Sequence, residues 1–270
     1  HCVTRRQRQM CIRDRLILVI YVARMLVHKK EVIKDFKLGI VPILWPIVII
    51  CGLILPADFS TAAMLFIVCF IMLFVGGAKL KHLSAMIGVS IAGFAILILL
   101  NLAFPGLLPR IDTWQKRITS FESGSQKENY QAEMAKRAVA NGFLFGKGPG
   151  KGHVKNDLYS AQSDFIYASS IEEFGSIFGG LGLVIMYTIL FFRSIRIMNK
   201  TESLFGAYVV FGLSFLLVFQ SLINMGVGVN LFPVTGQPLP LISMGGTSII
   251  FSCVALGIII NVSRTVYKDA

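Results

Sequence analysis

Asp164 is the residue of this chain whose type and surroundings best suit general-base chemistry. It stands where a polar segment meets a long apolar one, and Phe165, Ile166 and Tyr167 follow it directly. A carboxylate at the boundary between water and lipid is costly to place, so it is a candidate functional group. Partial desolvation would also make it a stronger base. The alternative is structural, because a Ser or Asp at this point could cap the helix that follows.

Two further carboxylates, Glu172 and Glu173, follow Asp164 closely. The separation of Asp164 and Glu172 is just over two helical turns, so both would share one face of a continuous helix. Carboxylates on one face could bind a divalent cation, Mg²⁺ or Mn²⁺, or divide acid and base roles. They could equally be buried polar contacts between helices. The sequence has no closed set of metal ligands, so a metal stays open.

A glycine-rich segment with two lysines, GKGPGKG at 146–152, precedes these acids. Its composition is that of a loop that cradles phosphate. It lacks the spacing of a P-loop, however, and no strand can precede it in so apolar a chain. The alternative is a flexible turn at the surface, and the spacing alone does not decide between the two.

The stretch 224–248, NMGVGVNLFPVTGQPLPLISMGGTS, carries glycine and proline at a density that breaks or kinks membrane helices. Backbone groups freed in this way are tolerated only where they are buried in protein or line a wet cavity. Small residues near its end, Ser243, Gly245 and Thr247 among them, allow helices to approach closely. The stretch predicts a cavity wall or a tightly packed seam, in either case opposite Asp164.

The rest of the chain must hold these residues in a membrane. Of its 270 residues, 55% are hydrophobic and 15% charged, with 26 Lys and Arg against 14 Asp and Glu. This composition excludes a soluble domain, a disulfide-stapled secreted domain and a free nucleic-acid binder. The net charge of +12 then indicates basic loops at a membrane surface. Cys51, Cys69 and Cys253 lie in apolar runs and are predicted to be small buried hydrophobic residues.

Seven apolar stretches are long enough, or nearly so, to cross a hydrocarbon core about 30 Å thick. They are 16–27, 38–55, 61–76, 83–104, 171–192, 204–227 and 239–262. We therefore predict an all-α polytopic membrane protein. It would have four helices in 16–104, one large polar loop in 105–163, three helices in 164–265 that carry the motifs, and a short tail, 266–270.

Clusters of Lys and Arg indicate the orientation of these helices. The clusters lie at 29–37, 79–81, 193–200 and 264–268, and alternate threading places all of them on one side. By the positive-inside rule that side is the cytoplasm, so the large loop faces outward. Asp58 would lie on the outer side too, as the cap of the third helix. The arginine-rich tail 1–15 contradicts this orientation, so we expect it to be foreign to the protein and exclude it from the functional interpretation.

Together these motifs resemble those of the SEDS family, the FtsW/RodA/SpoVE group of bacterial polytopic membrane proteins. The resemblance covers about residues 16–265, and its later part is closer to the FtsW division branch than to RodA. Tyr167 and Met244 differ mildly from the residues commoner in the family. Members usually have ten helices, so the resemblance implies that N-terminal helices are missing here. The residues that carry it are Trp114, Arg117-Ile118, Tyr130-Gln131, Gly148-x-Gly150, DFIY-x4-EEFG at 164–175, and 224–248.

The resemblance implies a peptidoglycan glycosyltransferase that polymerises lipid II during septal wall synthesis in cell division. Its site would lie on the extracytoplasmic face of the bacterial plasma membrane. The family's essential aspartate falls on Asp164, which would act as the general base. A divalent cation could bridge the departing diphosphate and a carboxylate, and no other cofactor is expected. The expected substrate-binding residues are Arg117, Lys147, Lys151, Glu172, Ser243 and Thr247.

The implied partners are the membrane, lipid II (a polyprenyl-diphosphate-linked disaccharide peptide), a class B penicillin-binding transpeptidase and other division proteins, without nucleic acid. A flippase for the lipid-linked precursor is the main rival, since broken helices and a polar cavity would also serve transport. A non-catalytic division scaffold is the third interpretation. A flippase needs polar groups through the membrane midplane, whereas the acids of this chain collect at the outer mouth.

Overall fold

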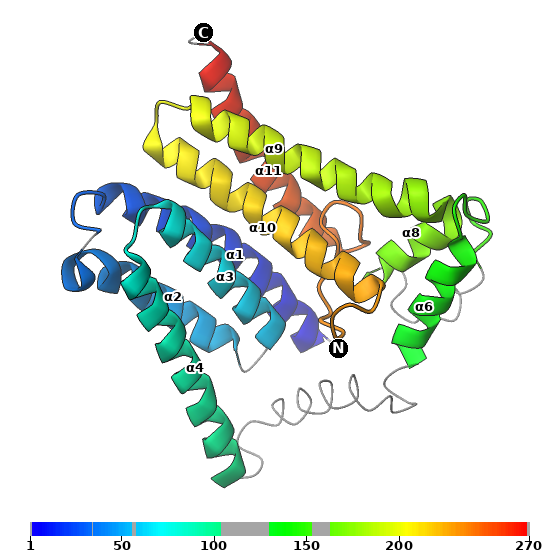
Figure 1. The fold of residues 1–270 in the computed structure, drawn as a ribbon, viewed down its shortest axis with the longest axis horizontal. Helices are drawn as coiled ribbons and strands as arrows, with labels where there is room; N and C mark the ends of the chain where they lie inside the picture. The colour runs from blue at the N-terminus through cyan, green and yellow to red at the C-terminus, as the bar shows by residue number, and fades with distance from the viewer. Residues whose placement is uncertain (1, 34, 56–57, 104–129, 153–162, 269–270) are drawn as a thin grey trace.

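The computed structural model describes residues 2–33, 35–55, 58–103, 130–152 and 163–268, and every regular element in these ranges is a helix (Figure 1). This confirms the predicted all-α class. The helices are α1 (Cys2–His28), η1 (Phe36–Ile40), α2 (Val41–Ile54), α3 (Phe59–Val75), α4 (Leu80–Ala103), α6 (Tyr130–Gly142), α8 (Ile166–Gly175), η2 (Ser176–Leu181), α9 (Gly182–Lys200), α10 (Leu204–Gly228) and α11 (Gly246–Lys268).

Each predicted span overlaps helical structure over most of its length. Among the described residues, four helical segments are long and apolar enough to cross a membrane, and two apolar helices are shorter. The long ones are Phe36–Ile54, Ile166–Lys200, Leu204–Gly228 and Gly246–Val266; the shorter ones are Phe59–Val75 and Leu80–Gly93. The predicted multi-pass membrane architecture is therefore confirmed.

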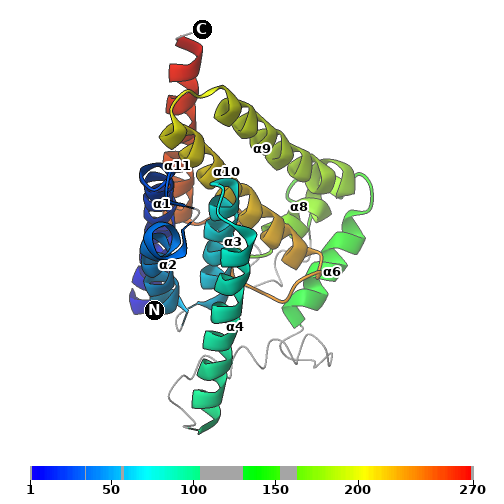
Figure 2. The ribbon, with the colours of Figure 1, turned by 60° about the vertical axis from the view of Figure 1, so that its left-hand side comes forward.

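Helix α10 forms the centre of the bundle (Figures 1 and 2). It packs against α1, α3, α9 and α11, and also against α8 and α6. Gly212 is a point of close approach, where a Cβ atom would lie 2.7 Å from Met72 Sδ and from Val19 Cγ1. The missing side chain leaves room there for side chains of α1 and α3.

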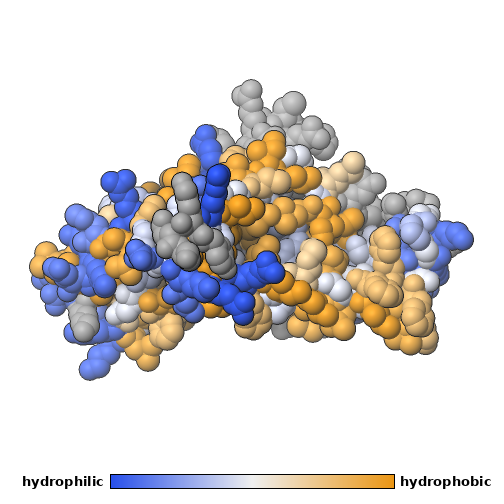
Figure 3. Space-filling view, turned by 90° about the horizontal axis from the view of Figure 1, so that it is seen from above, coloured by the Kyte–Doolittle hydropathy of each residue, from blue (hydrophilic) through white to orange (hydrophobic). Residues whose placement is uncertain are grey.

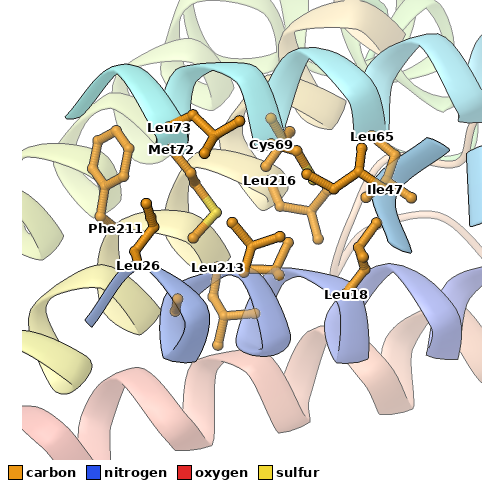
Figure 4. Close-up of a cluster of buried hydrophobic side chains, with 14 of the residues drawn as sticks. Leu18, Leu26, Ile47, Leu65, Cys69, Met72, Leu73, Phe211, Leu213 and Leu216 are labelled. Atoms are coloured by element: carbon orange, nitrogen blue, oxygen red, sulfur yellow. The ribbon is translucent and has the colours of Figure 1, made fainter. Parts of the chain in front are cut away.

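An apolar core fills the space between α1, α2, α3 and α10 (Figure 4). On α2 the buried residues recur every three or four positions, which is the pattern of a helix with one buried stripe. Cys51 and Cys69 are buried, as predicted. The prediction was wrong for Cys253, which is exposed because α11 turns little of its surface toward the bundle. The labelled core residues are Leu18, Leu26, Ile47, Leu65, Cys69, Met72, Leu73, Phe211, Leu213 and Leu216.

The two ends of the bundle hold different segments (Figure 1). The connections 29–33, 76–79 and 201–203 lie at one end with the C-terminus of α11, and the basic clusters lie in or next to these segments. The opposite end holds the start of α3, the start of α8 and residues 229–245; we call it the aspartate end, after Asp58 and Asp164. This arrangement is the alternate threading that the basic clusters predict. Seen from above, hydrophilic residues form a large group toward one end and a smaller group at the other, with a broad hydrophobic area between them (Figure 3).

Two predicted spans differ from the structure, and the predicted polar loop contains a helix. Helix α11 begins only at Gly246, because the preceding residues form a turn in which Leu241 has a φ of +69° and the Tyr187 hydroxyl donates to Pro240 O. The fifth span is not one straight helix, since α8 ends at Gly175, with a φ of +84°, and α9 runs in a different direction (Figure 1). The polar loop 105–163 contains α6, whose buried alanines share one face and pack on α8.

Candidate active site at the aspartate end

A buried polar network joins α1, α3 and residues 229–245 at the aspartate end. The Thr61 hydroxyl stands at its centre and donates to Asp58 Oδ2 at 2.6 Å. The Thr61 hydroxyl oxygen also accepts from Arg15 Nη2 at 2.8 Å and from Gln237 Nε2 at 2.6 Å. A hydroxyl has one donor and two acceptor positions, so Thr61 is fully engaged. Side chains from three segments are thereby held in one arrangement.

Arg15 belongs to this network, although the sequence interpretation excluded residues 1–15. Its exposure is 5%, and Nη1 donates to Gln237 Oε1 at 3.0 Å and to Gln220 Oε1 at 3.4 Å. A buried guanidinium is stable only when such acceptors surround it. The boundary after residue 15 was therefore wrong for Arg15, which lies on α1 one residue before the apolar stretch begins.

Asp58 caps α3, which confirms the predicted role. Its carboxylate accepts from Thr61 N at 3.3 Å and from the Ser60 hydroxyl at 2.8 Å. Gln237 Nε2 adds a bond of 3.3 Å to Oδ2. The carboxylate of Asp58 is thus bonded to the first turn of α3 and to the segment that crosses above it.

Asp164 lies half-buried in the turn before α8. Its main-chain carbonyl accepts from Asn224 Nδ2 at 2.9 Å, and its Oδ1 accepts from the Ser163 hydroxyl at 3.0 Å. The N-cap of α8 is Phe165, and no side chain makes a capping bond there. The N-cap position therefore falls on Phe165 and not on Ser163 or Asp164, and Asn224 of α10 bonds to the Asp164 main chain.

Residues 235–237 contact both aspartates. The Ser60 hydroxyl donates to Thr235 O at 3.0 Å, and Gln237 bonds to Asp58 as described. A Cβ atom at Gly236 would lie 3.8 Å from Asp164 Oδ2. The stretch 224–248 therefore lies beside Asp164 at this point, as predicted.

Ser243 and Thr247, two predicted substrate-binding residues, differ in their surroundings. Ser243 is buried; its hydroxyl donates to Ser163 O at 2.6 Å and accepts from Leu239 N at 2.7 Å. Thr247 is half-buried in the first turn of α11. The structure thus gives Ser243 a bonding role next to Asp164, and contact of either residue with substrate stays a prediction.

The glycine-rich segment 146–152 is packed against the C-terminal part of α8. Lys147 N donates to Glu172 O at 3.0 Å, and Gly148 N donates to Glu173 O at 3.0 Å. These N–H groups satisfy carbonyls at the end of a helix and are not available to a phosphate. Both sequence interpretations, the phosphate cradle and the flexible turn, are therefore wrong for 146–148, because backbone bonds to α8 fix this part of the segment.

Two predicted substrate-binding residues, Lys147 and Glu172, contact each other. Lys147 Nζ lies 3.8 Å from Glu172 Oε1, and the Glu172 side chain is only 1% exposed. The shared helix expected for Asp164 and Glu172 does not form, because α8 begins two residues after Asp164. Lys151 is exposed. Arg117 lies outside the described residues.

Within the described ranges, no group of three or more His, Cys, Asp and Glu side chains is placed to hold a metal ion. The divalent cation stays a prediction. Sequence reasoning also missed several residues of the network, namely Arg15, Thr61, Gln220, Asn224 and Gln237. Asn224 and Gln237 lie inside the motif at 224–248, so their polar type at a helix break could have indicated them.

The fold and the site define a class: a polytopic helical membrane protein whose polar site lies at one end of the bundle. The chain belongs to the FtsW/RodA/SpoVE family of cell cycle proteins, whose family model matches residues 14–268. This confirms the predicted SEDS membership, and the matched region includes Arg15.

Characterised relatives agree with this assignment. Stage V sporulation protein E of Bacillus subtilis (strain 168) is 33% identical over 256 residues, which are 93% of this chain and 67% of that protein. The "Probable peptidoglycan glycosyltransferase FtsW" of Aliivibrio salmonicida (strain LFI1238) is 32% identical over 259 residues, covering 93% of this chain and 62% of the relative. The chain thus spans about two thirds of the length of these relatives.

Solved structures share the fold. One, described as "Structural coordination of polymerization and crosslinking by a peptidoglycan synthase complex", matches with a TM-score of 0.68 at 24% identity, over 95% of this chain and 70% of that one. The rod shape determining protein RodA of Thermus thermophilus matches with a TM-score of 0.55 at 24% identity, over 93% of this chain and 66% of RodA.

Proposed function

We propose that this protein is a peptidoglycan glycosyltransferase that polymerises lipid II, with Asp164 as the general base. The names of the FtsW relatives support this reaction class. One observation within the chain carries the proposal: side chains from α10 and from 229–245 hold the main chain at Asp164 and at the residue before it. Such an arrangement fixes a carboxylate at the water boundary, where a lipid-linked sugar would meet it.

In the proposed reaction, an acceptor-sugar hydroxyl attacks the anomeric carbon of the donor. Asp164 takes the hydroxyl proton while the new C–O bond forms. The bond from the anomeric carbon to the diphosphate breaks, and the polyprenyl diphosphate leaves with the electron pair. Arg117 and the exposed Lys151 are the cations that we propose for this diphosphate. Lys147 is a weaker candidate because it lies beside Glu172.

The placement of buried polar groups supports glycosyl transfer over lipid flipping. In the described part of α10, the buried hydroxyls of Ser214 and Ser221 donate to carbonyls of their own helix. The polar side chains that link different segments gather instead at the aspartate end, around Thr61 and Asn224. A flippase would need polar groups along the whole path of the headgroup.

We further propose that the protein acts at the division septum, with its site on the extracytoplasmic side and a class B penicillin-binding transpeptidase as partner. The orientation follows from the basic clusters at the end opposite Asp164. The likeness to a chain of a peptidoglycan synthase complex is compatible with such a partner.

Substitution of Asp164 tests the proposal. We expect D164N and D164A to lower lipid II polymerisation by the purified protein in lipid nanodiscs at least roughly 100-fold, because the proton acceptor is lost. Glycan product on gels measures the rate, and circular dichroism during heating checks the fold. E202Q, a change at an exposed acid at the opposite end, serves as the control. Polymerisation by D164N at the rate of the unchanged protein would contradict the assignment.

A further inference from the structure

Asn224 is a buried amide in the last turns of α10, and it bonds to the turn before α8. Its exposure is 1%, and its Nδ2 donates to Asp164 O at 2.9 Å and to Gln237 O at 2.7 Å. Both amide hydrogens therefore bond to carbonyls outside α10. One belongs to the proposed base, and the other belongs to the segment that passes beside the Asp164 carboxylate.

Ser243 likewise bonds to the main-chain carbonyl of Ser163, the residue before Asp164. Its hydroxyl donates to Ser163 O, and Leu239 N donates to that hydroxyl in turn. A backbone bond at the start of α8 runs from Ser169 N to Phe165 O, and the helix begins at Ile166, after Asp164. Two consecutive carbonyls, those of Ser163 and Asp164, are thus held by side chains of the 224–248 motif.

The amide oxygen of Asn224, Oδ1, indicates which bonds of this residue matter. Within the described part of the chain, its buried Oδ1 has no hydrogen-bond partner. A buried polar atom without a partner is unfavourable, so an apolar residue would fill this space better. The two N–H bonds are what an apolar residue could not supply.

We propose that Asn224 and Ser243 are positioning residues of the transferase site: they fix the turn that carries Asp164 and so set the rate of proton removal. The inference rests on the proposed function of Asp164. The carboxylate is only a few bonds from the held carbonyl, so a shift of the turn moves the proton acceptor. A displacement near 1 Å in a catalytic group lowers a rate roughly 100-fold.

Three variants separate bonding from space filling. N224D keeps the shape but replaces the NH₂ donors, N224L keeps the approximate size without polar atoms, and S243A removes only the hydroxyl. For N224D and N224L we expect kcat for lipid II polymerisation to fall roughly 10- to 100-fold, while KM stays within about threefold of the unchanged protein. The fall in kcat should be smaller for S243A. S214A is the matched control, because the buried Ser214 hydroxyl donates to Phe211 O of its own helix. This variant should keep kcat within about twofold.

Hydrogen–deuterium exchange of the full-length protein gives a readout that does not depend on activity. We expect amides of 163–170 to exchange faster in N224L and S243A, while those of α3 keep their protection. Wild-type kcat in N224D, or an effect on KM alone, would overturn the inference. Exchange that rises throughout α10 would show a structural role only and would overturn it as well. If D164N is inactive while N224D is active, this inference fails and the proposed function stands; an active D164N contradicts the proposed function itself.

Discussion

Asp58 and Asp164 stand at the same end of the bundle, each before a helix and each near residues 235–237, yet they are held in different ways. Asp58 is held by its carboxylate, which caps α3 and bonds to Gln237. Asp164 is held by its main-chain carbonyl through Asn224, and the N-cap of α8 is Phe165. A carboxylate that forms a helix cap has a structural role. Anchoring through the main chain fixes a residue without requiring its carboxylate.

The supports of the two aspartates also differ. Asp58 rests on α3, which belongs to the large apolar core with α1, α2 and α10. Asp164 precedes α8, a ten-residue helix that packs on α6 and receives the segment 143–148 at its C-terminal end. The α6–α8 unit shares a small apolar cluster with α10, made of Ala135, Ala138, Phe165, Ala168 and Val227. It also contains backbone bonds, closely packed glycines and one ion pair, which single substitutions can test.

Substitution of Asp164 should lower the catalytic rate, whereas substitution of Asp58 should lower the stability. The loss of rate is the largest effect that we expect. D164N should lower the rate of polymerisation at least roughly 100-fold, with little change in thermal stability. D58A should lower the free energy of unfolding by about 2 kcal/mol, because it removes a helix cap and leaves buried donors unpaired. Measuring rate per folded molecule separates the two. An inactive but stable D58A would place Asp58 in the chemistry and end the distinction.

Substitution at Gly175 tests the support of Asp164 alone. Gly175 has a φ of +84°, and a Cβ atom there would lie 2.3 Å from Leu144 O. Gly150 has a φ of +77° but no atom within 4 Å of a Cβ. G150A should cost about 1 kcal/mol for the backbone conformation, whereas G175A should cost about 3 kcal/mol because the clash is added.

Thermal unfolding of both glycine variants measures these costs, and polymerisation assays show whether the damage reaches Asp164. We expect G175A to lose activity while the exchange protection of α3, around Asp58, is retained. Equal stability of G175A and G150A would show that the contact with Leu144 contributes nothing to the α6–α8 unit.

The spans could be predicted from the sequence because hydropathy reports directly on the lipid environment. Helix α10, Leu204–Gly228, coincides with its predicted stretch almost residue for residue. The cap at Asp58 was predictable too, since it depends on neighbours in the chain. Asp164 was found through its position at a boundary between polar and apolar segments, together with the family resemblance.

The partners of the polar residues could not be predicted. Arg15 bonds to Gln237, 222 positions away, and no local pattern encodes such a pairing. The predictions for the segment 146–152 were wrong for a related reason. A loop that binds phosphate and a loop that packs on a helix end both need glycine. Only the identity of the acceptors, here Glu172 O and Glu173 O, distinguishes them.

Breaking the ion pair of Lys147 and Glu172 should change the free energy of unfolding least. The direction of that change in a double variant shows how the two residues depend on each other. Glu172 is buried, and the Lys147 side chain is 36% exposed. K147M leaves a buried carboxylate without this partner and should lower the free energy of unfolding by about 1 kcal/mol. E172Q in the K147M background removes that charge and should restore part of the loss, so the double variant should melt above K147M. A double variant that melts below both single variants would show that Glu172 stabilises the α6–α8 unit independently of Lys147.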